Sequence, residues 1–201
     1  MTFPELIGIN KKIVLASKSP RRKKLLENLG FELEIINSNY KEEKVDNHKD
    51  YPQYVIFNAE QKGLSVQKKI SDDCIIISAD TIVVLNDEIL HKPKDTEEAF
   101  LILKKLSGNT HQVYTGICLI DNKTQKIIKD YKQTNVSFRE LEDNEIWQYI
   151  NTGSPMDKAG AYGIQDDFGA IFVNKIEGCY YNIVGLPLEL LYNMLKKMNT
   201  I

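Results

Sequence analysis

The sequence predicts an α/β or α+β fold in which helices flank one sheet of mixed parallel and antiparallel strands. Short β-prone runs alternate with amphipathic helical segments along most of the chain. A long hairpin pattern over residues 113–138 interrupts this alternation in the middle. The 201 residues are 42% hydrophobic and 27% charged, with no repeat or clear linker. We therefore expect residues 1–201 to form a single domain, or two closely joined lobes.

The N-terminal segments predict a strand, a capped helix and a second strand. Residues 13–16 form a short apolar run typical of a buried strand. Ser19 followed by Pro20 indicates a helix start, with serine as the N-cap and proline in the first turn, and Gly30 ends this helix. The other elements expected here are a strand at 31–36, a polar loop at 38–49 and an amphipathic helix at 51–70.

The next region predicts two strands separated by a polar tripeptide. Residues 74–77 and 81–85 are strongly β-prone, and the intervening residues 78–80 indicate that the first strand ends at Asp80. The elements expected after them are a turn at 86–87 into a strand at 88–90, and a helix at 96–106 that starts with a capping box of Asp95 and Glu98.

The C-terminal half predicts a long hairpin followed by short elements. Residues 153–169 are rich in glycine and small side chains, which suggests backbone packed closely against another group. The elements expected here are hairpin strands at 113–120 and 127–138, a helix at 142–150, a strand at 170–176 and a helix at 187–198.

The composition narrows the class of protein. A net charge of −2 and a pI of about 6.0 argue against a dedicated nucleic-acid-binding protein, which usually carries a basic excess. The three cysteines are far apart, so we expect reduced thiols, buried at Cys74 and Cys118, and no zinc site. No apolar run reaches the ~18 residues of a membrane span, and the start lacks a signal-peptide pattern. We expect a cytoplasmic protein without a membrane or nucleic-acid partner.

A basic run at residues 17–24 opens the first predicted helix. A helix N-terminus presents unpaired backbone N–H groups to anions. The forked guanidinium groups of Arg21 and Arg22 suit phosphate oxygens, so these residues and Ser17 are candidates for phosphate binding. The alternative is a solvated basic helix face.

Three further residues could carry chemistry. Asp80 occupies a position where α/β proteins often place a catalytic base or metal ligand, although it could instead cap a turn. Lys92, before Pro93, could offer a point charge to phosphate or be an exposed turn residue. Gln165 offers a donor and an acceptor to a nucleobase edge, unless its glycine-rich segment only serves the loop backbone.

Taken together and in order, these clusters resemble the Maf family, whereas the common phosphate-loop, dinucleotide-binding and nucleophile-elbow motifs are absent. Any one matching segment would be weak, but the ordered set extends from residue 15 to residue 188 and is highly specific. The matching segments are 16–22, 79–84, 92–93, 106–111, 114–116, 157–165 and 185–188.

The resemblance implies a nucleoside triphosphate pyrophosphatase, which cleaves a nucleoside triphosphate to a monophosphate and pyrophosphate. It also implies a strongly twisted mixed sheet and a cleft between two lobes, similar to the inosine triphosphatase fold. Members of the family use a divalent cation, usually Mg²⁺ or Mn²⁺, and are often homodimers. We expect a divalent cation here, and a homodimer is a further expectation.

The family's site residues carry over onto positions of this chain. Asp80 falls on the proton acceptor, and Glu42, with its neighbour Glu43 as the alternative, falls on an acidic metal-site residue. The metal is therefore expected at Glu42 and Asp80. With the local reasoning above, the substrate-binding set consists of Ser17, Arg21, Arg22, Lys62, Thr81, Lys92 and Gln165. Among these, the positions linked to substrate choice are Arg21, Thr81 and Gln165.

Thr81, directly after the aspartate, resembles the branch of the family that acts on dTTP and UTP, and modified pyrimidine triphosphates would also suit it. The branch that acts on 7-methyl-GTP tends to carry glutamine there and is the alternative within the family. A non-catalytic nucleotide-binding regulator of cell division is a second alternative, although such a protein would not need the carboxylate of Asp80. A nucleic-acid-binding module is a third.

Four positions depart from the family pattern, namely Gln61, His91, Ser154 and Asp166. Ser154 stands where the family commonly has glutamate, and Asp166 stands where glycine usually follows the glutamine. None of the four is an assigned catalytic residue. These departures bear on the loop geometry near the base and on the range of substrates.

Overall fold

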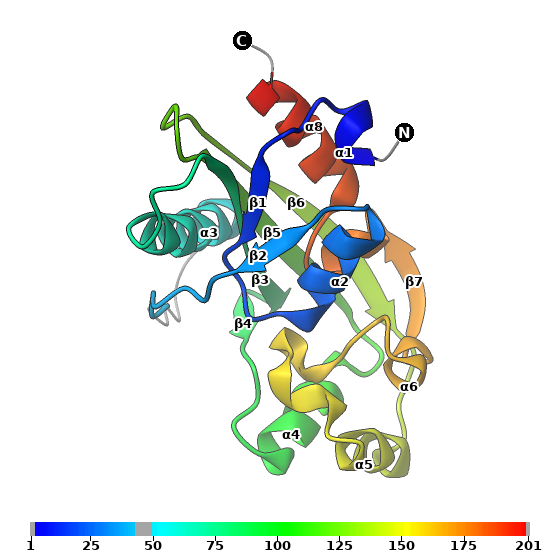
Figure 1. The fold of residues 1–201 in the computed structure, drawn as a ribbon. Coiled ribbons are helices and arrows are strands. Elements are labelled where there is room, and N and C mark those ends of the chain that lie inside the picture. The colour runs from blue at the N-terminus through cyan, green and yellow to red at the C-terminus, as the bar shows by residue number, and fades with distance from the viewer. Residues whose placement is uncertain (1–2, 43–49, 200–201) are drawn as a thin grey trace.

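The computed structural model describes residues 3–42 and 50–199, and its strands form one mixed, twisted sheet (Figure 1). The strands are β1 (Lys12–Leu15), β2 (Leu33–Ile35), β3 (Cys74–Leu85), β4 (Glu88–Leu90), β5 (Thr110–Asp121), β6 (Ile127–Phe138) and β7 (Val173–Glu177). Their order is β2-β1-β3-β5-β6-β7, and β4 pairs with β3. β1 runs parallel to β2 and β3, and the other pairs are antiparallel, which confirms the predicted mixed sheet.

Helices cover both faces of the sheet and build a second lobe at one end of it (Figure 1). They are α1 (Phe3–Leu6), α2 (Pro20–Asn28), α3 (Tyr51–Gln67), α4 (Thr96–Leu106), α5 (Asp143–Asn151), α6 (Asp167–Ala170), α7 (Tyr180–Val184), α8 (Leu188–Asn199) and the 3₁₀ turns η1 (Ser154–Asp157) and η2 (Ala159–Ala161). α3 packs on one face, and α2 and α8 pack on the other. The second lobe consists of α4, α5 and the 3₁₀ turns around the ends of the long strands. None of the described helices is long and apolar enough to cross a membrane.

Most predicted elements are confirmed with boundary shifts of a few residues. Ser19 caps α2, since its side chain accepts a hydrogen bond from the backbone N–H of Arg22. Asn86 and Asp87 form the predicted turn with positive φ. The short helices α1, α6 and α7 have no counterpart in the prediction because four or five residues are too few to show helical periodicity. Residues 37–42 contain no helix or strand, as expected for the loop, and its remainder lies outside the described residues.

The three cysteines are free, as expected, and Cys74 and Cys118 are buried in the core between α3 and the sheet. Burial raises the pKa of the Cys118 thiol to about 12, so this thiol stays protonated at physiological pH. The apolar runs around both residues therefore predicted their environment correctly.

Strand β3 continues without a break through residues 78–80, so the prediction that a strand ends at Asp80 is wrong. These residues pair with residues 116–118 of β5. The polar side chain of Ser78 is satisfied within the core because its Oγ donates to the carbonyl oxygen of Ala59 in α3 at 2.6 Å. Residues 78–80 look like a strand end in the sequence because the groups that pair with them, in β5 and α3, come from distant segments of the chain.

The edge of β3 beside Asp80 is left open. β1 pairs with β3 only as far as Ile77, and β4 joins the same edge at Val83. Residues 78–82 thus have β5 on one side and, within the described part of the chain, no strand on the other. In α/β sheets, ligands usually bind where the carboxyl ends of parallel strands leave a crevice. The gap after β1 therefore positions a candidate site next to the start of α2.

Gly116 allows α3 to lie close to β5, opposite Asp80. A Cβ built on Gly116 would overlap the backbone carbonyl of Val55. We expect Gly116→Ala to lower the free energy of unfolding by about 2 kcal/mol, because backbone is hard to displace in a packed core. Urea unfolding measures this loss. Gly153→Ala is the control, since its Cβ would meet no atom within 4 Å and only its positive φ would cost about 1 kcal/mol. Equal losses in both variants would contradict the close packing.

A buried histidine links β5 to the second lobe. His111 is fully buried, and its Nε2 lies 2.8 Å from the hydroxyl of Tyr162. Its Nδ1 is buried with no hydrogen-bond partner among the described residues. Burial lowers the pKa of His111 from its usual 6.5 to about 3, because the imidazolium would be desolvated without a counter-charge.

This histidine should make the protein sensitive to mild acid. The unfolded chain takes up a proton on His111 below about pH 6.5, whereas the folded protein does so only near pH 3, so stability falls as the pH drops through this window. Between pH 6.5 and 5, we expect the wild type to lose about 1–2 kcal/mol more than His111→Gln, which cannot titrate. Urea unfolding of both proteins across this range measures the difference. Parallel stability curves would rule out His111 as the source.

Candidate active site

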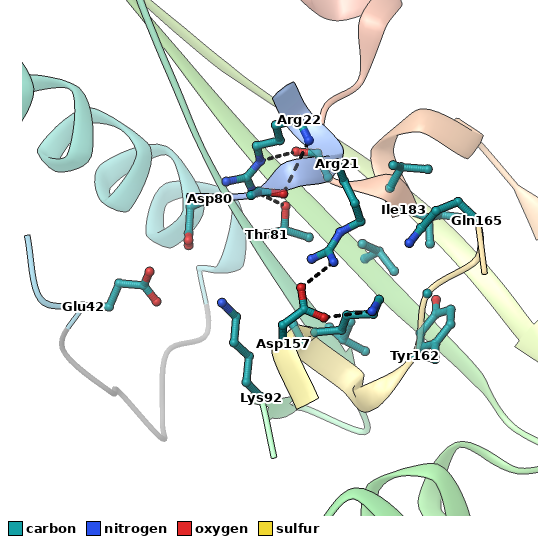
Figure 2. A pocket seen from close by; sticks show the side chains of 18 of the residues that line it. Arg21, Arg22, Glu42, Asp80, Thr81, Lys92, Asp157, Tyr162, Gln165 and Ile183 are labelled. Atoms are coloured by element: carbon teal, nitrogen blue, oxygen red, sulfur yellow. Dashed lines mark hydrogen bonds and ion pairs between the residues drawn. The ribbon is translucent and has the colours of Figure 1, made fainter. Parts of the chain in front are cut away.

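A cavity that is open to solvent lies at the gap in the sheet between the two lobes (Figure 2). It is lined by five cationic side chains and three carboxylates, namely Arg21, Arg22, Lys62, Lys92, Lys158, Glu42, Asp80 and Asp157. The excess of positive charge suits a polyanion. Apolar groups from β3, β5 and α7, together with Tyr162, line the rest of the wall.

Asp80 is the most buried carboxylate of the cavity, with 4% of its surface exposed. Its Oδ1 lies 2.5 Å from Nζ of Lys62, and its Oδ2 accepts a hydrogen bond from Nδ2 of Asn58 at 3.2 Å. Lys62 and Asn58 are one turn apart on α3, so both side chains face the same strand. Asn58 was not predicted as a site residue, although its i, i+4 spacing to Lys62 on a predicted helix was a usable signal.

Lys62 also lies 2.5 Å from Oε1 of Glu42, so one ammonium group bridges the two predicted metal ligands. The two carboxylates are therefore close enough to share a cationic partner. The described residues contain no cluster of three or more metal-ligating side chains. Mg²⁺ commonly uses one or two protein carboxylates together with water and substrate phosphates, so Asp80 and Glu42 fit such an ion. Glu43, the alternative to Glu42, lies outside the described residues.

Arg22 occupies the open edge of β3. Its guanidinium group donates to the carbonyl oxygens of Ala79 at 2.9 Å and Gly185 at 2.8 Å, in the position that a neighbouring strand would otherwise take. It also donates to Oγ of Ser17 at 3.3 Å and to Oγ1 of Thr81 at 2.9 Å. Burial lowers the pKa of Arg22 to about 10. The guanidinium group of Arg22, which was predicted to bind phosphate, therefore donates mainly to acceptors of the protein itself.

Thr81 belongs to the same hydrogen-bond network. Its hydroxyl accepts from Arg22 and lies 2.9 Å from the hydroxyl of Thr115, which donates in turn to the carbonyl oxygen of Asn182 at 3.0 Å. The hydroxyl of Thr81 therefore has protein partners on both sides. Thr81 thus contacts Arg22, and both residues line the cavity.

Arg21 crosses the cleft from α2 to the second lobe. Its Nη1 donates to Oδ2 of Asp157, in η1, at 2.7 Å (Figure 2). Lys92 points into the same space, and burial lowers its pKa. Arg21 has one carboxylate partner, and no ion pair of Lys92 is found among the described residues, so both cations are available to a further anion.

Gln165 lines the far end of the cavity beside Tyr162 (Figure 2). Its Nε2 donates to Oδ1 of Asp166 at 2.9 Å, and its Oε1 has no hydrogen-bond partner among the described residues. An amide oxygen without a protein partner at the wall of a polar cavity can accept a hydrogen bond from a donor on a ligand.

Eight of the nine predicted site residues line this cavity, and Ser17 lines the adjoining hollow that shares Arg21, Arg22 and Lys62 with it. Asp157, Lys158 and Tyr162 also line the cavity, and they were predicted only as part of the glycine-rich segment and not as individual site residues. The spacing of that segment gave no periodicity from which inward-facing side chains could be chosen.

Comparison with known proteins finds a matching family model and relatives that are about 50% identical to this chain. A family model described as Maf-like protein matches residues 12–198. A protein of Thermoanaerobacter pseudethanolicus named dTTP/UTP pyrophosphatase is 50% identical over 186 residues, 92% of this chain and 96% of the relative. A Clostridium perfringens protein of the same name is 49% identical over 92% of this chain and 96% of its own length. A solved nucleoside triphosphatase, dITP/XTP pyrophosphatase, from Mycobacterium abscessus is 14% identical, with a TM-score of 0.39 over 65% of this chain and 75% of that chain.

Proposed function

The chain belongs to the Maf-like protein family, and we propose that it hydrolyses dTTP and UTP to the nucleoside monophosphate and pyrophosphate. One observation carries the proposal: the buried carboxylate of Asp80, held by Lys62, opens into a cavity where cations outnumber carboxylates. A carboxylate repels a bound polyanion, and this cost is offset if the carboxylate acts as a base or binds a metal ion during the reaction. The names of the relatives and the family match point to the same reaction.

The triphosphate binds along the cationic wall in this proposal. Arg21 and Lys92 contact phosphate oxygens, with backbone N–H groups at the start of α2 near Ser19. The phosphate chain takes the place of Asp157 at Arg21. Arg22 contributes positive charge and holds the edge of β3 in position. In this proposal the α-phosphate lies near Asp80.

The reaction is the attack of water on the α-phosphorus. Asp80 accepts a proton from the water as the new P–O bond forms, the bond to the bridging oxygen breaks, and pyrophosphate leaves. Lys62 and Asn58 keep the carboxylate in position, and the cations neutralise charge on the phosphate oxygens. Asp80 and Glu42 would hold a divalent cation, Mg²⁺ or Mn²⁺, which when bound supplies further neutralisation of the phosphate charge.

In this proposal the nucleobase is selected at the end of the cavity that contains Gln165. Gln165 presents a hydrogen-bonding amide there, and Thr81 influences the choice through Arg22. A site built to hydrogen-bond one base edge rejects the wrong base strongly, because buried polar groups are then left unpaired. A cytoplasmic location and a homodimer stay predictions of the family resemblance, and gel filtration with light scattering tests the dimer.

Pyrophosphate release from dTTP, UTP, CTP, GTP, ATP and 7-methyl-GTP, with Mg²⁺ and with Mn²⁺, tests the proposal. We expect turnover of dTTP and UTP to exceed that of the other nucleotides at matched concentration. Preference for 7-methyl-GTP would move the chain to the other branch of the family. Tight nucleotide binding without turnover would favour the non-catalytic regulator.

A further inference from the structure

We propose that Asp166 is a positioning residue that fixes the orientation of the Gln165 amide and thereby makes the cavity select uracil and thymine over cytosine. The inference rests on the proposed function and extends it to a residue outside the assigned site. It begins from the hydrogen bond between Nε2 of Gln165 and Oδ1 of Asp166, 2.9 Å long.

Asp166 is surrounded by hydrogen-bond donors. Its Oδ2 accepts from the hydroxyl of Ser154 and from the hydroxyl of Tyr149, the latter at 3.3 Å, and it pairs with Nζ of Lys158 at 3.3 Å. Lys158 is itself 7% exposed and also donates to Oδ1 of Asp157 at 2.8 Å. The carboxylate group therefore cannot turn away from Gln165 without breaking several contacts.

The fixed carboxylate determines which end of the amide faces it. An ionised carboxylate only accepts hydrogen bonds, whereas the side chain of glutamine has a donating end and an accepting end. Rotating the amide by 180° would bring Oε1 of Gln165 against Oδ1 of Asp166, which is repulsive and leaves an N–H unpaired. The Nε2 end is therefore held at Asp166, and Oε1 with the second N–H is left for the cavity.

A glycine at residue 163 leaves the space in which Gln165 and Asp166 meet. A Cβ built on Gly163 would lie 2.5 Å from Oδ2 of Asp166 and 2.8 Å from Nε2 of Gln165. The backbone N–H of Gly163 in turn donates to the hydroxyl of Tyr149 at 3.0 Å. The absence of a side chain at residue 163 thus allows the amide and the carboxylate to meet beneath the cavity wall.

The orientation of the amide matters because pyrimidines differ in the order of their donors and acceptors. Uracil and thymine present an N3–H donor beside the O4 acceptor, and cytosine presents an N3 acceptor beside an amino donor. An amide whose acceptor position is fixed can pair with only one of these two patterns, and each good bidentate pair gives substantial discrimination. An amide free to rotate could pair with both.

Asp166→Asn tests the proposal, because asparagine is nearly isosteric and can either accept from Nε2 or donate to Oε1 of Gln165. We expect the ratio of kcat/KM for UTP to that for CTP to fall about 10-fold, mainly through better use of CTP. Ser154→Ala is the matched control, since it removes one donor to Asp166 and leaves the bond to Gln165 intact. Its ratio should stay within about twofold of the wild type.

The Gln165→Ala background separates positioning from a general effect on the loop. If Asp166 acts through Gln165, adding Asp166→Asn to Gln165→Ala should leave the UTP-to-CTP ratio unchanged. An unchanged ratio in the single variant Asp166→Asn, or an equal fall in the Gln165→Ala background, would overturn the proposal.

Calorimetric binding of α,β-imido-UTP and α,β-imido-CTP, which resist cleavage, distinguishes this inference from the proposed function. Preference of the wild type for the uridine analogue, lost in Asp166→Asn, supports the inference even if no nucleotide is hydrolysed. Equal binding of both analogues by the wild type would overturn the inference even if the enzyme is active.

Discussion

Replacement of Asp80 by asparagine is expected to lower kcat for dTTP and UTP by about 10²–10⁴-fold, the usual contribution of a positioned general base. Asparagine fills the same volume and keeps an acceptor for Asn58, so the strand and α3 should stay in place. It cannot take a proton from water, and it removes the charge that Lys62 pairs with. KM should change much less than kcat, because Arg21 and Lys92, which bind the triphosphate in the proposed arrangement, do not contact Asp80.

Initial rates of pyrophosphate release at matched metal and substrate measure this effect. Glu60→Gln serves as the control, because Glu60 lies on the same helix but forms its ion pair with Lys129 outside the cavity. Its kcat should equal that of the wild type. Unchanged turnover in Asp80→Asn, with an unchanged melting temperature, would remove Asp80 from the reaction.

The sequence contained most of the secondary structure but could not show the gap in the sheet. The N-cap at Ser19, the turn at Asn86 and the long hairpin follow from local rules, and all three are confirmed. The open edge beside Asp80 arises because β1 and β4 pair with different parts of the same strand, as long-range pairing dictates. Local periodicity carries no information on where such pairings end.

The candidate site was predicted as a set of residues, mostly through the ordered motifs of the family. What each side chain contacts could not be predicted, because Arg22 reaches acceptors at positions 79 and 185 that are far away in the sequence. Ser154 and Asp166 were recognised separately as departures from the family pattern. Their contact became apparent only in the structure, since both lie in a segment without regular periodicity.

Replacement of Arg22 by methionine is expected to lower the free energy of unfolding by about 2–4 kcal/mol, although the residue belongs to a charged surface run in the sequence. The change leaves the carbonyl oxygens of Ala79 and Gly185 without their donors in a buried place, and each unsatisfied group costs about 1–3 kcal/mol. Part of the loss is offset because methionine requires no desolvation of a buried cation. The melting temperature should fall by roughly 5–15 °C for a chain of this size.

Arg21→Met is the matched control for Arg22→Met, because it changes the neighbouring residue of the same helix in the same way. The ion pair of Arg21 with Asp157 is exposed on the aspartate side, and such pairs contribute about 0–1 kcal/mol. Arg21→Met should therefore keep its melting temperature and raise KM, whereas Arg22→Met should lose stability as well as activity. Calorimetry and initial rates on both variants separate the two roles. Equal stability of the two variants would show that the carbonyl groups at the open edge of β3 find other donors, and that Arg22 acts only on the ligand.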